Sequence, residues 1–393
     1  MREPRDRPEA HLSGDSAPSA HEEAAPRPPA RPRAGSRALA AALLALLPLA
    51  TALGTAVWGW RVVHRPYQGW AGEEVLIDLP SGMGARAIVE RLEAAGVIPS
   101  AGLGRLHLLY LLDDPPLLAG EYRFDRPAST AEVLDRIARG DVASHPLTIV
   151  EGLTLEETAT AIAAAGFGAR GRLLEAMSDP TPIHDLDPAA TDLEGYLFPE
   201  TYAFARGITE REIVATMVGL FRRTLERRLP GPNGQTLSPG KVRDLVTLAS
   251  IVEKETGLDQ ERPLVAGVFV NRLALGIPLG ADPTIIFALK KAGTWDGNIR
   301  RPDLSLDSPY NTYLRAGLPP GPICSPGLHS LRAAAAPAET RHLYFVSRND
   351  GSHVFAPTLQ EHNRNVERWQ KAFWRDRAQG AAVDAPSSGP STP

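Results

Sequence analysis

The chain has very little cysteine: Cys324 is the only one in 393 residues. A single cysteine excludes an intramolecular disulfide and any metal site built from several cysteines. The sequence also has no H-E-x-x-H and no G-x-S-x-G motif, and His342, His353 and His362 are dispersed rather than clustered. A formal net charge of -4 gives no basic excess for nucleic acid. The sequence therefore predicts no metal site and no nucleic-acid partner.

Two glycine-rich segments resemble cofactor-binding motifs but lack their context. "GFGARG" at 166–171 matches the dinucleotide fingerprint, yet it follows an alanine-rich helical segment where the fingerprint must follow a strand. "GQTLSPGKV" has the wrong spacing for a phosphate loop, and Val242 stands where serine or threonine is required. We therefore expect no cofactor.

One long uncharged run dominates the N-terminal region, from Ala38 to Trp60. A helix rises about 1.5 Å per residue, so about 20 residues cross a bilayer's hydrocarbon core. Four arginines precede the run within eleven residues, which favours a cytoplasmic N-terminus. The alternative is a cleaved signal peptide, but "WGWRVVHR" is a poor cleavage site. The sequence predicts an uncleaved, single-pass anchor.

Composition divides the chain into segments and predicts an α+β fold class. The ends are rich in proline, alanine and small polar residues, too poor in large apolar side chains to bury a core. Between them, alternating and helical patterns indicate a small α+β module and a larger mixed α+β domain. The expected segments are a disordered cytoplasmic head (1–37), a transmembrane helix (38–60), the small module (72–145), the larger domain (146–372) and a disordered tail (379–393).

Local signals place several elements. Ser129 and Gly140 are typical of the start and stop of a helix, and Thr154 with Glu157 forms a capping box. A strand is expected at 147–150. "RHLYFVSR" and "GSHVFAP" read as two strands around an Asn-Asp-Gly turn at 349–351.

The helix "LASIVEKETG" carries two carboxylates on opposite shoulders of its apolar stripe. At 100° per residue, Glu253 and Glu255 lie about 160° apart, so only one can reach a given substrate atom. Ser250 and Lys254 are expected to point away from the stripe. Apolar neighbours raise a carboxyl pKa and suit a general acid. The helical wheel does not choose between the two glutamates, and a solvent-facing or ion-paired side chain is the ordinary alternative for either.

Other segments combine aromatic rings with hydroxyl, amide and carboxylate groups, which suits a sugar ligand. They are "LEGYLFPETYAF", "LGADPTIIFAL" and "DSPYNTYLRAGLPPGPICSPG". Ordinary core and turn packing would explain each segment equally well. The candidate substrate-binding residues are Glu194, Tyr196, Glu200, Asp282, Thr284, Tyr310, Asn311 and Tyr313.

Taken together, these segments resemble the endolytic murein transglycosylases of the YceG-like (MltG) type. The resemblance rests on "EGLTLEETA", "LEGYLFPETYAF", "LASIVEKETG", "VFVNRLALGIPLGADPTIIFAL", "SPYNTYLRAGLPPGPICSPG" and "LYFVSRNDGSHVFAPTLQEHN", in this order. It covers roughly residues 70–370. Asn271, in the fourth motif, joins the candidate substrate-binding residues.

The resemblance implies an inner-membrane enzyme that faces the cell wall, with its catalytic domain outside the cytoplasm. It implies cleavage of the β-1,4 bond between N-acetylmuramic acid and N-acetylglucosamine within glycan strands. The small module would be a LysM-like glycan-binding subdomain, and the catalytic acid would map onto Glu253. The expected partners are peptidoglycan glycan strands and the membrane, with peptidoglycan synthases as further candidates.

One carboxylate is enough for this chemistry, whereas ordinary glycosidases use two. The acid protonates the leaving oxygen and then takes a proton from the sugar's own C6 hydroxyl, which attacks C1 and closes a 1,6-anhydro ring. Two alternatives stay open: a non-catalytic wall-binding scaffold of the elongation or division machinery, and a hydrolysing muramidase.

Overall fold

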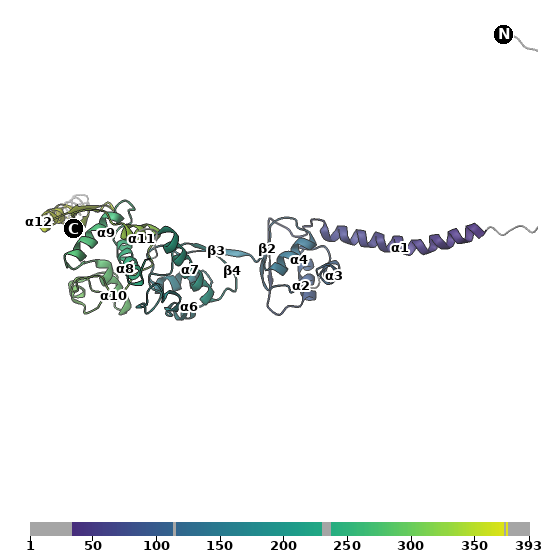
Figure 1. Cartoon of the computed structure of the whole chain (residues 1–393), viewed down its shortest axis with the longest axis horizontal. Helices are drawn as coiled ribbons and strands as arrows, with labels where there is room; N and C mark the ends of the chain where they lie inside the picture. Colours follow the sequence, from purple (N-terminus) through teal and green to yellow (C-terminus); the bar gives the residue numbers. More distant parts are fainter. Residues whose placement is uncertain (1–33, 113–114, 230–236, 373–374, 376–393) are drawn as a thin grey trace, which may run out of the picture. The chain divides into compact units, whose positions relative to one another are not determined.

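The computed structural model of the chain describes residues 34–112, 115–229, 237–372 and 375, and its fold is mixed α+β (Figure 1). The predicted head, apart from its last four residues, and the predicted tail lie outside the described residues. The N-terminal helix α1 runs from Ala34 to His64, and Leu44–His64 is long and apolar enough to cross a membrane. The helix thus extends beyond the predicted 38–60 at both ends. The uncharged run marks only the most apolar part, because a helix continues through flanking arginines such as Arg37 and Arg61.

The segment after α1 begins with a small α+β unit that has its own apolar core. Its two strands pair antiparallel, and its three helices supply most of the remaining buried side chains. β2 was missed by the sequence analysis, because only two of its five residues are apolar. Ser129 caps α4 through a reciprocal capping box with Glu132, and Gly140 ends it at φ 69°, as predicted. The elements are β1 (Val75–Leu79), α2 (Ala85–Ala94), α3 (Ala101–Leu111), β2 (Gly120–Phe124) and α4 (Thr130–Arg139).

The remaining elements are mostly helices, with two further antiparallel strand pairs, β3–β4 and β5–β6. β3 spans Ser144–Thr148 rather than the predicted 147–150, because its ladder partner β4 (Thr201–Ala205) sets its bounds. The turn at 349–351 joins β5 to β6 as predicted, with Asn349 at φ 66°. The other elements are α5 (Leu155–Ala164), α6 (Arg170–Met177), α7 (Glu210–Arg228), α8 (Pro239–Glu255), α9 (Arg262–Ala274), α10 (Asp282–Lys291), α11 (Leu328–Ala335), β5 (Tyr344–Ser347), β6 (His353–Ala356) and α12 (Leu359–Val366).

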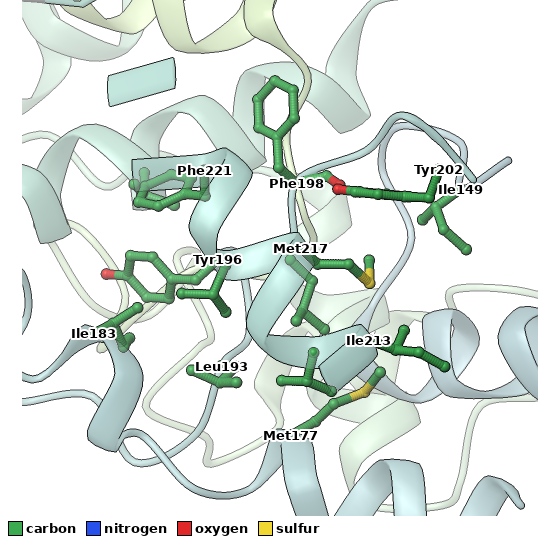
Figure 2. Packing of buried hydrophobic residues seen from close by; sticks show 14 of the residues in the cluster. Ile149, Met177, Ile183, Leu193, Tyr196, Phe198, Tyr202, Ile213, Met217 and Phe221 are labelled. Carbon is green, nitrogen blue, oxygen red and sulfur yellow. The ribbon is translucent and has the colours of Figure 1, made fainter. Parts of the chain in front are cut away.

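Helix α8 is packed on two sides. Val246 and Ala249 belong to a core built with α5, α6 and α7, part of which Figure 2 shows around Tyr196 and Phe221. Ile251 and Val252 belong to a second core built with α9 and α10. Because both sides are covered, the prediction that Ser250 points away is wrong. Ser250 is fully buried, and its hydroxyl donates to the Thr247 carbonyl and accepts from Ile323 N.

Candidate functional site

The last turn of α8 carries the two glutamates that the sequence analysis singled out, and their surroundings differ. Glu253 Oε1 accepts a hydrogen bond from Arg262 Nη2 at 3.1 Å, and Glu253 Oε2 accepts one from Gly327 N at 2.9 Å. The two side chains of this ion pair are 6% and 7% exposed. Arg262 begins α9 and Gly327 precedes α11, so the Glu253 carboxylate ties three helices together. Both of its oxygens are occupied by protein donors.

A second carboxyl lies close to this ion pair. Burial, with the charge of Glu253 as the next cause, raises the pKa of Glu151 above its ordinary value. A Cβ atom at position 327 would collide with the Glu151 carboxyl, so any larger residue there would have to push that side chain aside. The "VEGLT" segment and the turn before α11 are therefore packed directly against each other.

Glu255 instead lines a cavity of about 560 Å³, together with Arg272, Asp282 and Tyr313. Among the residues that the structure describes, none forms a hydrogen bond with the Glu255 side chain. Burial raises the pKa of Glu255 to about 8, the negative charge of Asp282 adds to this shift, and Arg272 opposes it. A carboxyl with this pKa is protonated at neutral pH and free to donate.

Asp282 and Tyr313 form the polar wall beside Glu255. Asp282 is the first residue of α10, and the Tyr313 hydroxyl donates to its Oδ1 at 2.5 Å. Burial and this hydrogen bond raise the pKa of Tyr313 above its ordinary value, so it stays a donor. Of the predicted site residues, the structure brings these two together in a cavity, with Glu255 rather than Glu253.

Arg272 supports the same cavity. Its guanidinium donates to the main-chain oxygens of Leu279 and Leu343, both at 2.6 Å, and lies 5.0 Å from the centre of the Tyr344 ring. These bonds fix the loop before α10 and the segment before β5. The sequence analysis did not single out Arg272, because nothing local distinguishes it from other helix-end arginines.

Three predicted substrate-binding residues hold backbone segments. Asn271 Nδ2 donates to the carbonyls of Thr340 and His342 at 2.8 and 3.0 Å. Asn311 is fully buried; its Nδ2 donates to the carbonyls of Leu304 and Leu306, and its Oδ1 accepts from Tyr313 N. Thr284 is fully buried and its hydroxyl bonds Ala281 O and Thr312 Oγ1. None of the three lines the cavity at Glu255; each holds main-chain segments next to it.

The other candidates lie elsewhere. Tyr196 sits in the core shown in Figure 2, where its hydroxyl donates to Asp187 at 2.6 Å. Tyr310 packs against Phe287, with ring centres 4.8 Å apart.

Two candidate carboxylates line separate cavities. Glu194 accepts from Leu155 N at the start of α5, lines a cavity of about 410 Å³ with Trp295, and has its pKa raised to about 8 by burial. Glu200 is exposed and lines a third cavity, beside α7. In the described part of the chain, no group of three or more histidine, cysteine or acidic side chains is placed to hold a metal ion.

Comparison with known proteins places these features in a family. Residues 77–368 match the model of the YceG-like family. A Bacillus subtilis protein named endolytic murein transglycosylase is 32% identical over 311 residues, which cover 75% of this chain and 84% of that protein. A Streptococcus pneumoniae protein of the same name is 31% identical over 324 residues, covering 74% of this chain and 58% of that protein.

A crystal structure of a YceG-like protein from Listeria monocytogenes is 31% identical to this chain. The match covers 75% of this chain and 99% of that one, with a TM-score of 0.48. With its family model spanning most of the sequence and its relatives above 30% identity, the chain belongs to the YceG-like family.

Proposed function

We propose that this protein is an endolytic murein transglycosylase whose general acid is Glu255. The observation that carries the proposal is a carboxyl with a pKa of about 8 in a cavity, next to Asp282 and Tyr313 and without a protein hydrogen bond among the described residues. We infer the activity from the relatives in Bacillus subtilis and Streptococcus pneumoniae, which are named endolytic murein transglycosylase. The substrate is the β-1,4 bond from N-acetylmuramic acid to N-acetylglucosamine inside a glycan strand.

The choice of Glu255 departs from the sequence-based assignment to Glu253, which stays a prediction. An acid catalyst must hold a proton that it can give to the substrate. Glu253 accepts from a guanidinium and a main-chain N–H, so both of its oxygens are already engaged by protein donors. Glu255 has neither bond, and Asp282 disfavours its charged form. The same helix therefore offers one carboxylate for structure and one for chemistry.

The reaction needs no second carboxylate as acid, base or nucleophile, and no water. Glu255 gives its proton to the oxygen that leaves C1, and the bond between C1 and that oxygen breaks. The Glu255 carboxylate then takes the proton of the C6 hydroxyl, whose oxygen bonds to C1 and closes the 1,6-anhydro ring. Asp282, beside the reacting centre, stabilises the positive charge that develops on the sugar. Tyr313 holds Asp282 in place through its hydroxyl.

The proposal includes the location of the enzyme and the role of its small unit. α1 would anchor the protein in the cytoplasmic membrane as a single span, with the arginines that precede the apolar run on the cytoplasmic side. The catalytic residues would then face the cell wall. The unit built from β1, α2, α3, β2 and α4 would be a LysM-like glycan-binding module, as the resemblance implies.

The test is digestion of purified glycan strands by the full-length protein in detergent, read by mass spectrometry. We expect internal cleavage that produces new 1,6-anhydro ends. A transglycosylase product is lighter by one water than the corresponding hydrolysis product. Products that carry the mass of a hydrolysed end would identify a muramidase, and intact strands would favour the scaffold alternative.

The same assay gives a pH prediction. Glu255 must be protonated in the free enzyme, so kcat/KM should fall as the pH rises above about 8. Glu194 also has a pKa of about 8, and Glu194→Gln is the matched control. The control should keep the alkaline fall. A fall that disappears in Glu194→Gln, or a profile that is flat to pH 9.5, would contradict the assignment to Glu255.

A further inference from the structure

The third cavity, beside α7, has no role in the chemistry described above. Its volume is about 730 Å³. One wall carries three arginines of α7, Arg223, Arg227 and Arg228, and the other carries the ends of β3 and β4 with the segments that flank them. This volume is within the range of cavities that hold small-molecule ligands.

The three arginines have no direct partner in the described part of the chain. All are exposed, and none forms an ion pair or a hydrogen bond with any residue that the structure describes. The neighbouring Arg222 is different, because its guanidinium makes two bonds with Asp185, at 2.8 and 2.6 Å. Residues 230–236, which follow α7 and are not described, contain no acidic side chain. Arg227 and Arg228 lie in the last turn of α7, where the helix dipole favours positive side chains. This does not explain the presence of Arg223, which lies a full turn earlier.

The acidic groups of the same cavity offset little of this charge. Burial and the nearby Glu253 disfavour the charged form of Glu151, whose pKa is raised. Glu200 is exposed, and one of its oxygens accepts from Thr201 N. His329 also lines this cavity, and its Nδ1 lies 3.4 Å from Asp259 Oδ2. The cavity is therefore electropositive on the α7 side, with hydroxyl and main-chain groups opposite.

We propose that this cavity is a subsite for the acidic peptides that murein glycan strands carry, with Arg223, Arg227 and Arg228 binding their carboxylates. Guanidinium groups bind carboxylates through paired N–H donors, and this geometry distinguishes them from point charges. Three such groups along two turns of one helix suit a peptide with several carboxylates better than a single small ion. The inference rests on the proposed function, since it assigns a subsite to the same substrate.

The experiment compares two substrates with the full-length protein in detergent. One is glycan with its peptides, and the other is the same glycan after an amidase has removed them. The variant is R223Q/R227Q/R228Q. Because the variant loses several charge-assisted hydrogen bonds to the peptide, KM for the peptide-bearing strands should rise about tenfold or more. KM for the stripped strands and kcat for both should not change.

Arg211→Gln is the matched control, because Arg211 is exposed on the same helix but does not line the cavity. It should leave both KM values unchanged. Equal KM values of the parent protein for the two substrates, or an equal rise for both in the triple variant, would overturn the proposal.

Cleavage of the stripped strands reports the proposed function by itself. If the parent cleaves neither substrate, calorimetric titration with the soluble acidic peptide still tests the subsite. Binding that the triple variant loses would support it, and no binding by the parent would overturn it.

Binding to vesicles of anionic phosphatidylglycerol tests whether the three arginines bind lipid headgroups instead of peptide carboxylates. Loss of vesicle binding in the triple variant without any change in peptide dependence would assign the arginines to lipid and overturn the proposal.

Discussion

Glu255→Gln should abolish the formation of 1,6-anhydro ends, whereas Glu253→Gln should leave the folded protein active. Glutamine keeps the size of the side chain and offers an N–H donor in place of the carboxyl O–H, but it cannot transfer a proton and then take one back. General acid–base catalysis contributes about 10²–10⁴-fold, so the rate of Glu255→Gln should fall at least that far. Glu253 does not line the cavity, and its two oxygens are engaged with Arg262 and Gly327.

The measurement is kcat on purified glycan strands, normalised to the folded fraction by circular dichroism. Glycan binding by Glu255→Gln, measured by co-sedimentation, should equal that of the parent, which separates loss of chemistry from loss of the substrate. Full activity of Glu255→Gln would contradict our assignment. If folded Glu253→Gln were inactive while Glu255→Gln worked, the assignment that the sequence resemblance implied would be correct.

Glu253→Gln should instead lower the free energy of unfolding. Its ion pair with Arg262 is almost fully buried, and removing one partner of such a pair costs at most about 3–5 kcal/mol, reduced here because Asp259 still pairs with Arg262. Chemical denaturation measures this cost as a lower midpoint. The matched control replaces both partners, Glu253→Leu with Arg262→Met, and should recover much of the stability, since no lone buried charge is left.

Glu255→Gln should not lower the free energy of unfolding in the same denaturation experiment, and above neutral pH it should raise it. The folded-state pKa of Glu255, about 8, is higher than the value of an unfolded glutamate, so the folded protein binds this proton more tightly. The stability that this proton contributes is complete below the unfolded pKa, about 4.3, and is lost as the pH rises to about 8. Glutamine mimics the protonated form, so Glu255→Gln should match the parent at pH 4 and exceed it at pH 8. A loss of stability in Glu255→Gln comparable to that of Glu253→Gln would contradict the division of roles between the two glutamates.

Local sequence signals were enough for many elements of the fold. The cap at Ser129, the stop at Gly140 and the turn at 349–351 depend on backbone preferences of a few adjacent residues, and the structure has all three. Strand β2 and the bounds of β3 were not predictable in this way. Their limits depend on a partner strand whose paired residues lie about 41 to 61 positions away along the chain.

The candidate site shows the same division. The spacing of "EKET" determined that its two glutamates face different surroundings, because 3.6 residues per turn separates them on the helix. Only the tertiary structure decided what those surroundings are: Arg262 and Gly327 reach one carboxylate, and the other lines a cavity beside Asp282. The pKa of a carboxyl depends on burial and on neighbouring charges, and those neighbours come from α9, α10 and the turn before α11, which the sequence order does not bring together.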